Sequence, residues 1–230
     1  MSKNKIILSI VIICIFILGF FVGRIDYDKL PKAELSEGLR GEYGIDKHIN
    51  EKTIDKYLNR SDTVYRDVRM LVDTASWENK GGDRYLSGYV AGFEVIPSPY
   101  LVNYTKEYIN QKEKENVHGL YQGNTLFTFS DGKYTANYVE SMSILEAIFP
   151  KDKNIFLMCG AGGYAGEVRK MLISLGWDEK LVRDVGGYWY YEGENSVSVK
   201  EIRDGKEYYN FSKVPYYNID FSSLTENNNA

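Results

Sequence analysis

The spacing of apolar residues alternates along the chain between helical periods and short runs of strand length. Apolar residues at helical spacing predict helices over residues 46–58, 101–111 and 139–149, and a fourth helix that ends at Gly176. Apolar runs of strand length cover residues 68–73, 90–96, 154–158 and 181–185. Because strands and helices alternate, the pattern predicts an α/β fold with a mainly parallel central sheet flanked by helices.

Two Asp-Gly pairs, Asp131-Gly132 and Asp204-Gly205, each lie between stretches of alternating apolar and polar residues. A type I′ turn needs positive φ at both central positions, which Asp-Gly adopts readily, so each pair predicts a β-hairpin. The predicted arms are residues 126–130 with 133–138 and residues 197–203 with 206–211.

The N-terminus carries a different pattern, in which residues 6–23 are apolar except for one serine. That length suits a helix that crosses a bilayer, and Lys3 and Lys5 before it favour a cytoplasmic N-terminus over residues 1–5. Residues 24–44 follow as a polar stalk. The sequence therefore predicts a single-pass anchor in the cell membrane, with the domain on the extracytoplasmic side.

Two other fates of this N-terminal segment stay open. Gly19 and Gly23 are small enough for the cleavage site of a signal peptide, although no A-x-A-like site follows the run. Cys14 would be the lipidated residue of a lipoprotein, but the bulky Ile13 stands where such signals carry a small residue. An uncleaved anchor is favoured because the apolar run is longer than a typical signal-peptide core.

Composition narrows the classes of function. With a net charge of -4 and no basic cluster, the chain lacks the surface that nucleic-acid binding needs. The two histidines, His48 and His118, are far apart in the sequence, so no metal site is indicated and no cofactor is implied. With Cys14 assigned to the membrane, Cys159 is the remaining thiol.

Cys159 directly follows the apolar run 154–158, at the turn from a predicted strand into a predicted helix. Ligands of open α/β sheets bind at this end of the strands. The glycine-rich loop that follows can turn its backbone N–H groups toward the sulfur, and the helix adds its positive end. We therefore expect an accessible thiol with a lowered pKa. The loop residues are Gly160, Ala161, Gly162, Gly163, Tyr164 and Ala165.

Residues 155–189 resemble the carboxyl-terminal half of a rhodanese domain. That half has a strand, a cysteine with a loop of five further residues, a helix ending in Leu-Gly, and a strand closed by Gly-Gly. The corresponding residues are Cys159, the helix end Leu175-Gly176 and the pair Gly186-Gly187.

The amino-terminal half is similar to the same family in two places. Leu71-Val72-Asp73-Thr74 stands where rhodaneses carry an apolar pair, Asp, and often Arg two places on. Residues 87–97 resemble the Gly-His-Ile-x-Gly-Ala … Pro element. On this resemblance, residues 45–195 form the rhodanese-like domain, with a hairpin insertion near residues 124–138. A C-terminal hairpin extension over residues 196–222 and a disordered tail over residues 223–230 complete the expected organisation.

The resemblance implies a sulfurtransferase. Cys159 would take sulfane sulfur from a small donor such as thiosulfate, hold it as a persulfide against the amides of residues 160–165, and pass it to a thiol acceptor. Asp73, Gly186 and Gly187 would be structural residues near the site. The loop lacks the family's usual Arg and Ser side chains, which leaves the donor open. The alternative is a non-catalytic module of the same fold that binds a partner at the cell surface.

Other cysteine chemistries fit the motif less well. A Cys-loop phosphatase needs Arg after five intervening residues, where this chain has Ala165, and a dithiol exchanger needs a second cysteine where it has Gly162. No Gly-Lys-Ser/Thr follows the glycines, which excludes a phosphate-binding P-loop.

Overall fold

The structure is a computed structural model that describes residues 29–36, 44–69, 88–103, 123–198 and 200–228. Residues 32–230 form one unit, in which the elements marked η are 3₁₀-helices. In chain order the elements are η1 (Ile54–Tyr57), β1 (Thr63–Asp67), β2 (Gly88–Val90), β3 (Glu94–Val95), η3 (Ser98–Tyr100), β4 (Val102–Asn103), β5 (Phe127–Ser130), β6 (Lys133–Ala136), α4 (Ser141–Ile148), β7 (Asn154–Cys159), α5 (Gly163–Ser174), β8 (Val182–Gly187), η4 (Tyr188–Tyr190), β9 (Ser196–Ser198), β10 (Lys200–Arg203), β11 (Lys206–Tyr209) and η5 (Phe221–Ser223).

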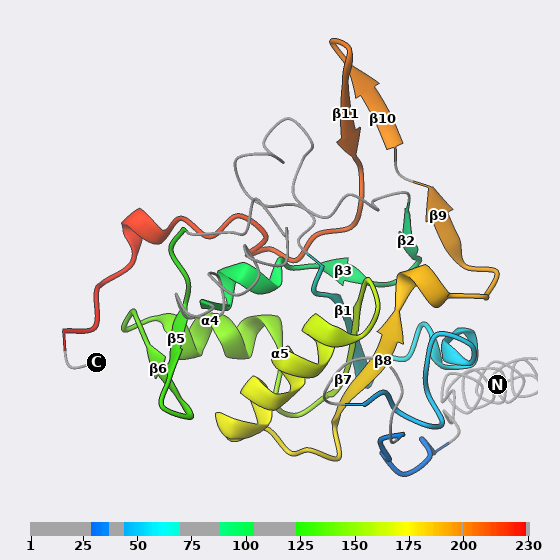
Figure 1. Cartoon of the computed structure of the whole chain (residues 1–230), viewed down its shortest axis with the longest axis horizontal. Coiled ribbons are helices and arrows are strands. Elements are labelled where there is room, and N and C mark those ends of the chain that lie inside the picture. The colour runs from blue at the N-terminus through cyan, green and yellow to red at the C-terminus, as the bar shows by residue number, and fades with distance from the viewer. Residues whose placement is uncertain (1–28, 37–43, 70–87, 104–122, 199, 229–230) are drawn as a thin grey trace, which may run out of the picture. The chain divides into compact units, whose positions relative to one another are not determined.

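A four-stranded parallel sheet in the order β3-β1-β7-β8 lies at the centre of this unit (Figure 1). β1 and β7 are its inner strands and pair from Thr63 opposite Asn154 to Asp67 opposite Met158. Parallel sheets are covered on both faces, so their strands read as continuous apolar runs, as β7 does. The expected α/β fold with a parallel central sheet is confirmed.

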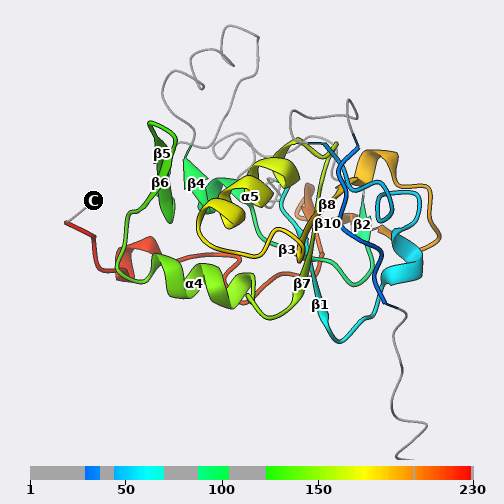
Figure 2. The same ribbon diagram turned by 90° about the horizontal axis from the view of Figure 1, so that it is seen from below.

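The two faces of the sheet are covered by different segments. Side chains alternate between faces along a strand, so Ile155, Leu157 and Cys159 share one face, and they belong to the same core cluster as α4 and α5. Phe156 points to the other face, where the ring of Tyr65 packs edge-on against it at 5.6 Å. Figure 2 shows the strands between the two α-helices and the segment of residues 45–57.

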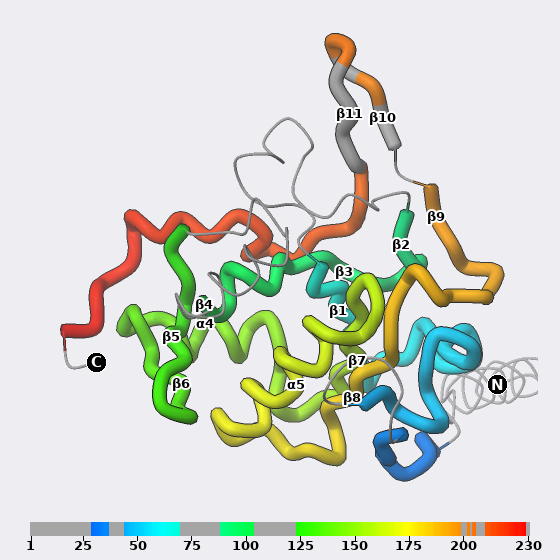
Figure 3. The backbone as a smooth tube through the Cα atoms, viewed as in Figure 1, coloured from blue at the N-terminus to red at the C-terminus, as the bar shows by residue number. Residues whose placement is uncertain are grey.

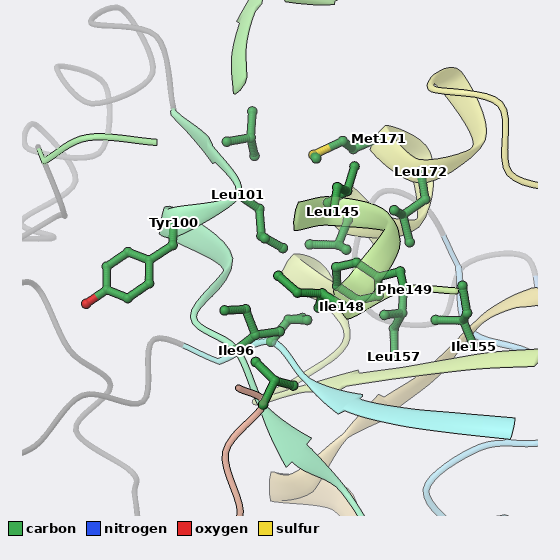
Figure 4. Close-up of a cluster of buried hydrophobic side chains, with 14 of the residues drawn as sticks. Ile96, Tyr100, Leu101, Leu145, Ile148, Phe149, Ile155, Leu157, Met171 and Leu172 are labelled. Carbon is green, nitrogen blue, oxygen red and sulfur yellow. The ribbon is translucent and has the colours of Figure 1, made fainter. Parts of the chain in front are cut away.

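The main core lies between the sheet and the two α-helices (Figure 4). Leu145 and Ile148 on α4 and Met171 and Leu172 on α5 are buried at helical spacing, as the sequence pattern predicted. Burying one such side chain stabilises the fold by about 1.5–3 kcal/mol, so the apolar stripes hold both helices on the sheet.

Both predicted hairpins are present. β5 pairs with β6 and β10 with β11, both antiparallel. The two turns have positive φ at both central residues: 49° at Asp131 and 77° at Gly132, then 51° at Asp204 and 74° at Gly205. The β10–β11 hairpin projects away from the central sheet at the top of Figure 1. Its predicted first arm is shorter than expected, because residues 196–198 form β9 and pair with β2 instead.

The helix predicted over residues 46–58 is wrong. Only Ile54–Tyr57 is helical, as the 3₁₀-helix η1. The Asp46 side chain accepts hydrogen bonds from the backbone N–H groups of His48 and Ile49, both at 2.9 Å, and so closes a turn where helix bonds would form. Its carboxylate also pairs with the buried Arg183 at 2.9 Å.

Three further boundaries differ from the sequence expectation. The strand expected over residues 68–73 lies earlier, at Thr63–Asp67, and residues 70–73 fall outside the described residues. The strand expected over residues 90–96 is divided into β2 and β3 by a turn with φ of 91° at Gly92. Of the helix expected over residues 101–111, Val102–Asn103 is the strand β4, and residues 104–111 lie outside the described part.

The C-terminal segment packs on the edge of the central sheet. Val95 of β3 receives a hydrogen bond from the N–H of Val214 at 3.1 Å and donates its own N–H to the carbonyl of Ser212 at 2.8 Å. Figure 3 shows this segment running from β11 past β3. The tail expected to be disordered is instead bonded through residue 227, since Thr225 binds the Glu140 carboxylate and Asn227 binds the backbone of β6.

The predicted membrane anchor over residues 6–23 and the first part of the stalk lie outside the described residues. Among the helices of the described part, none combines the length and the apolar character of a membrane span.

Candidate functional site

Cys159 is the last residue of β7, and its sulfur lies among backbone amides of the loop that leads into α5. The N–H of Gly162 donates to Sγ at 3.0 Å, and the N–H groups of Ala161 and Ala165 also bond the sulfur. Gly162 adopts a left-handed conformation, with φ of 107°, which turns the chain into α5. Of the six loop residues expected to supply amides, the structure thus bonds three to the sulfur: Ala161, Gly162 and Ala165.

The expected accessibility and lowered pKa of Cys159 are both wrong. The side chain is 2% exposed and belongs to the main core cluster. Burial, followed by the negative charge of Asp184, raises the pKa of the thiol to about 11, although the three amide bonds act in the opposite direction. At neutral pH the resting sulfur is therefore a protonated thiol.

Asp184 is a buried carboxylate on the neighbouring strand. It stands opposite Leu157 in the register of β7 and β8, on the same face of the sheet as Cys159. Its side chain is 1% exposed and accepts the N–H of Gly186 at 2.8 Å. Sequence reasoning missed this acid, because only the pairing of β7 with β8 brings it near the thiol.

The charge of Asp184 leads to a prediction about pH. In the wild type, alkylation of Cys159 by iodoacetamide should keep accelerating as the pH rises toward 11, because the fraction of thiolate keeps growing until the pH reaches the pKa. Asp184→Asn removes a charge that opposes the thiolate, so the pKa of Cys159 should fall. Alkylation at pH 8 should then become about tenfold faster for each pH unit by which that pKa decreases. Glu179→Gln, at an exposed acid beyond α5, is the matched control, and Cys159→Ala is the blank. Equal rates for Asp184→Asn and wild type would contradict the prediction.

The two glycines expected near the site lie directly beside the loop. Gly187 pairs with Cys159 at the end of the sheet, and a Cβ there would overlap the carbonyl oxygen of Gly160 and the Cα of Ala161. Gly186 has φ of 90°, and a Cβ there would overlap the Glu51 carboxylate. Gly187 therefore lets the end of β8 approach the cysteine loop closely, whereas Gly186 is required by its own positive φ and by the Glu51 side chain beside it.

Asp73 lies outside the described residues, and the structure places another acid at the end of β1. Asp67 is paired with Arg69 in a fully buried ion pair. Arg69 also donates to the carbonyl of Gly88 at 2.9 Å, and its guanidinium stacks over the ring of Tyr188 at 4.7 Å. Asp67 and Arg69 have the spacing of an Asp with an Arg two places on, but Tyr65 and Arg66 before them are not the apolar pair of the expected pattern.

A short aromatic stretch that follows β8 contacts the cysteine loop. Trp189 follows β8 in η4, and its N–H donates to the carbonyl of Gly160 at 3.0 Å. Its indole ring is 47% exposed. Trp189 thus contacts the residue next to Cys159 and solvent at the same time.

The described residues contain no group of three or more His, Cys, Asp and Glu side chains placed to hold a metal ion. Comparisons with protein-family models, with curated proteins and with solved structures give no match for this chain. The chemistry of the site is therefore inferred from its own geometry.

Proposed function

We propose that the protein is a rhodanese-like sulfurtransferase that carries sulfane sulfur on Cys159. The observation that supports this most directly is the position of Sγ at the carboxyl end of a parallel strand, within bonding distance of three backbone N–H groups. A nest of amides at the start of a helix stabilises an anion, and a cysteine persulfide is an anion that would extend from this sulfur.

The proposed reaction has two displacement steps. The Cys159 thiolate attacks the outer sulfur of thiosulfate, a new S–S bond forms, and the S–S bond of the donor breaks as sulfite leaves with its electron pair. A thiolate or cyanide acceptor then attacks the outer sulfur of the persulfide, and the Cys159 thiolate leaves. The proton of the resting thiol passes to solvent before the first step, and no cofactor takes part.

The loop supports this cycle through its main chain alone. The side chains of Gly160, Ala161 and Gly162 offer no charge, so the electrostatic stabilisation comes from the N–H groups of Ala161, Gly162 and Ala165. Such preorganised donors stabilise negative charge on Sγ as the thiolate attacks in the first step and as it leaves in the second. Burial keeps water away from a persulfide that water would otherwise compete to solvate.

The test is sulfur loading of the intact chain. We expect the wild type, incubated with thiosulfate at pH 9, to gain the mass of one sulfur atom and to form thiocyanate when cyanide is added. Cys159→Ala should do neither, because Cys159 is the one cysteine of the described residues. Turnover should rise with pH over the range in which the thiol ionises, up to about 11. Thiocyanate formation by Cys159→Ala at the wild-type rate would overturn the proposal.

A second candidate is a non-catalytic module of the same fold, and one observation favours it. Cys159 is both buried and strongly disfavoured as a thiolate, as expected of a cysteine that serves as a small core residue. The loading experiment separates the two. A folded wild type that gains no sulfur from thiosulfate or from a persulfide donor between pH 7 and pH 10 would favour the binding module.

A further inference from the structure

Trp189 lies directly on the cysteine loop. A Cβ added to Gly160 would lie 2.7 Å from Cζ2 and 2.8 Å from Cε2 of the indole, so the ring occupies the place where a side chain would stand. The N–H of Trp189 holds the carbonyl of the same glycine at 3.0 Å. The indole and the backbone of Trp189 therefore both contact the residue that follows Cys159.

Tyr188, just before Trp189, and Tyr191, two residues after it, are both anchored by contacts outside the cysteine loop. The hydroxyl of Tyr188 lies 2.8 Å from Ser196 Oγ, and its ring packs under the Arg69 guanidinium. The hydroxyl of Tyr191 donates to the Asp55 carboxylate at 2.5 Å. Because both flanks are fixed, the position of the indole is set by the scaffold and does not depend on the loop alone.

Trp189 lies at the boundary between the buried site and solvent. Cys159 and Gly160 are buried, whereas the indole that contacts Gly160 is 47% exposed. A large aromatic ring that is half in solvent and half on a buried glycine covers the loop at that point. A reagent that approaches the loop from this side must pass the indole.

We infer that Trp189 covers the cysteine loop and restricts Cys159 to small reaction partners. Given the proposed function, on which this inference rests, the sulfur donors would be compact anions with a terminal sulfane sulfur, such as thiosulfate, rather than donors whose sulfur carries an aryl group. Trp189 is then a specificity-determining residue that acts by steric exclusion.

The inference is tested with two thiol reagents of different size on the full chain at pH 9: methyl methanethiosulfonate, which is small, and the bulky aryl disulfide 5,5′-dithiobis(2-nitrobenzoate). We expect Trp189→Ala to raise the rate at which the aryl disulfide reacts with Cys159 by about tenfold or more relative to wild type. The bulky reagent needs a local opening of the loop, and that opening becomes easier without the indole. The rate with the small reagent should change much less. Cys159→Ala supplies the blank for Cys14, and Tyr190→Ala, at an equally exposed neighbouring ring, is the matched control.

Trp189→Phe provides a second variant, since it keeps a ring on Gly160 and should give an intermediate ratio of the two rates. Thermal unfolding confirms that each variant is folded. An unchanged ratio in both folded Trp189 variants, or the same change in Tyr190→Ala, would overturn the inference. The two reagents report access to the thiol and not sulfur transfer. If the protein selects reagents by size but gains no sulfur from thiosulfate, the role of Trp189 as a cover stands and only the proposed sulfurtransferase activity is rejected.

Discussion

Arg69→Ala should lower the free energy of unfolding by about 3–5 kcal/mol, because it leaves a buried carboxylate without its counter-charge. Asp67 and Arg69 are both fully buried, and Arg69 Nε bonds both carboxylate oxygens at 3.0 and 2.9 Å. The loss would also release the carbonyl of Gly88, so β2 should lose its attachment to the end of β1. Urea unfolding followed by circular dichroism measures the change.

Two comparisons make this result specific to the buried pair. Lys52→Ala removes one partner of an exposed pair with Glu192, and its effect should stay below about 1 kcal/mol. A double variant, Asp67→Asn with Arg69→Met, removes both charges and should be more stable than Arg69→Ala. If Arg69→Ala were as mild as Lys52→Ala, the pair would not be a main support of the sheet end.

Gly187→Ala should slow the loading of Cys159 with sulfur from thiosulfate and should cost about 1–3 kcal/mol of stability. A Cβ at this position meets backbone atoms of Gly160 and Ala161, which cannot move aside as a flexible side chain would. The loop must therefore shift away from β8 and take its amides off the sulfur. The gain of sulfur mass with thiosulfate at pH 9 and thermal unfolding measure the two effects.

Gly163→Ala is the matched control for this change. Gly163 belongs to the same loop and begins α5, but a Cβ there meets nothing within 4 Å. Alanine favours a helix more than glycine, so Gly163→Ala should leave the stability equal or raise it by up to about 1 kcal/mol. Equal losses of stability in Gly163→Ala and Gly187→Ala would contradict the prediction, because the effect would then not come from the close packing of Gly187 against the loop.

The parts of the fold that could be predicted well from the sequence are those whose signals are local. The buried strand β7, the glycines after it and the apolar stripe of α5 follow one another without interruption, so the strand, loop and helix could be read directly. The Asp-Gly turns are local in the same sense, since their residues alone determine the backbone conformation.

The failures involve partners that are distant in the sequence. β1 has the polar sequence Thr-Val-Tyr-Arg-Asp, which does not look like a buried strand. Its Arg66 is buried because Glu94 neutralises it at 2.6 Å and the carbonyl of Ile148 accepts its Nε at 2.8 Å. The raised pKa of Cys159 has a similar origin, because burial, its main cause, and the charge of Asp184, its second cause, both depend on strand pairing that could not be read from the sequence.

The bonding of the C-terminal segment to β3 and β6 affects how the chain can fold during synthesis. The partners of Val95 and Tyr138 are Lys213 and Glu226, which follow β8, the last strand of the central sheet, in the chain. The strand pairs β1–β7 and β7–β8 can assemble earlier, but β3 keeps an open edge until residues 212–214 have left the exit tunnel. Exposed strand edges pair with other chains, so the edge of β3 is where the nascent protein is prone to aggregate until its C-terminal segment arrives.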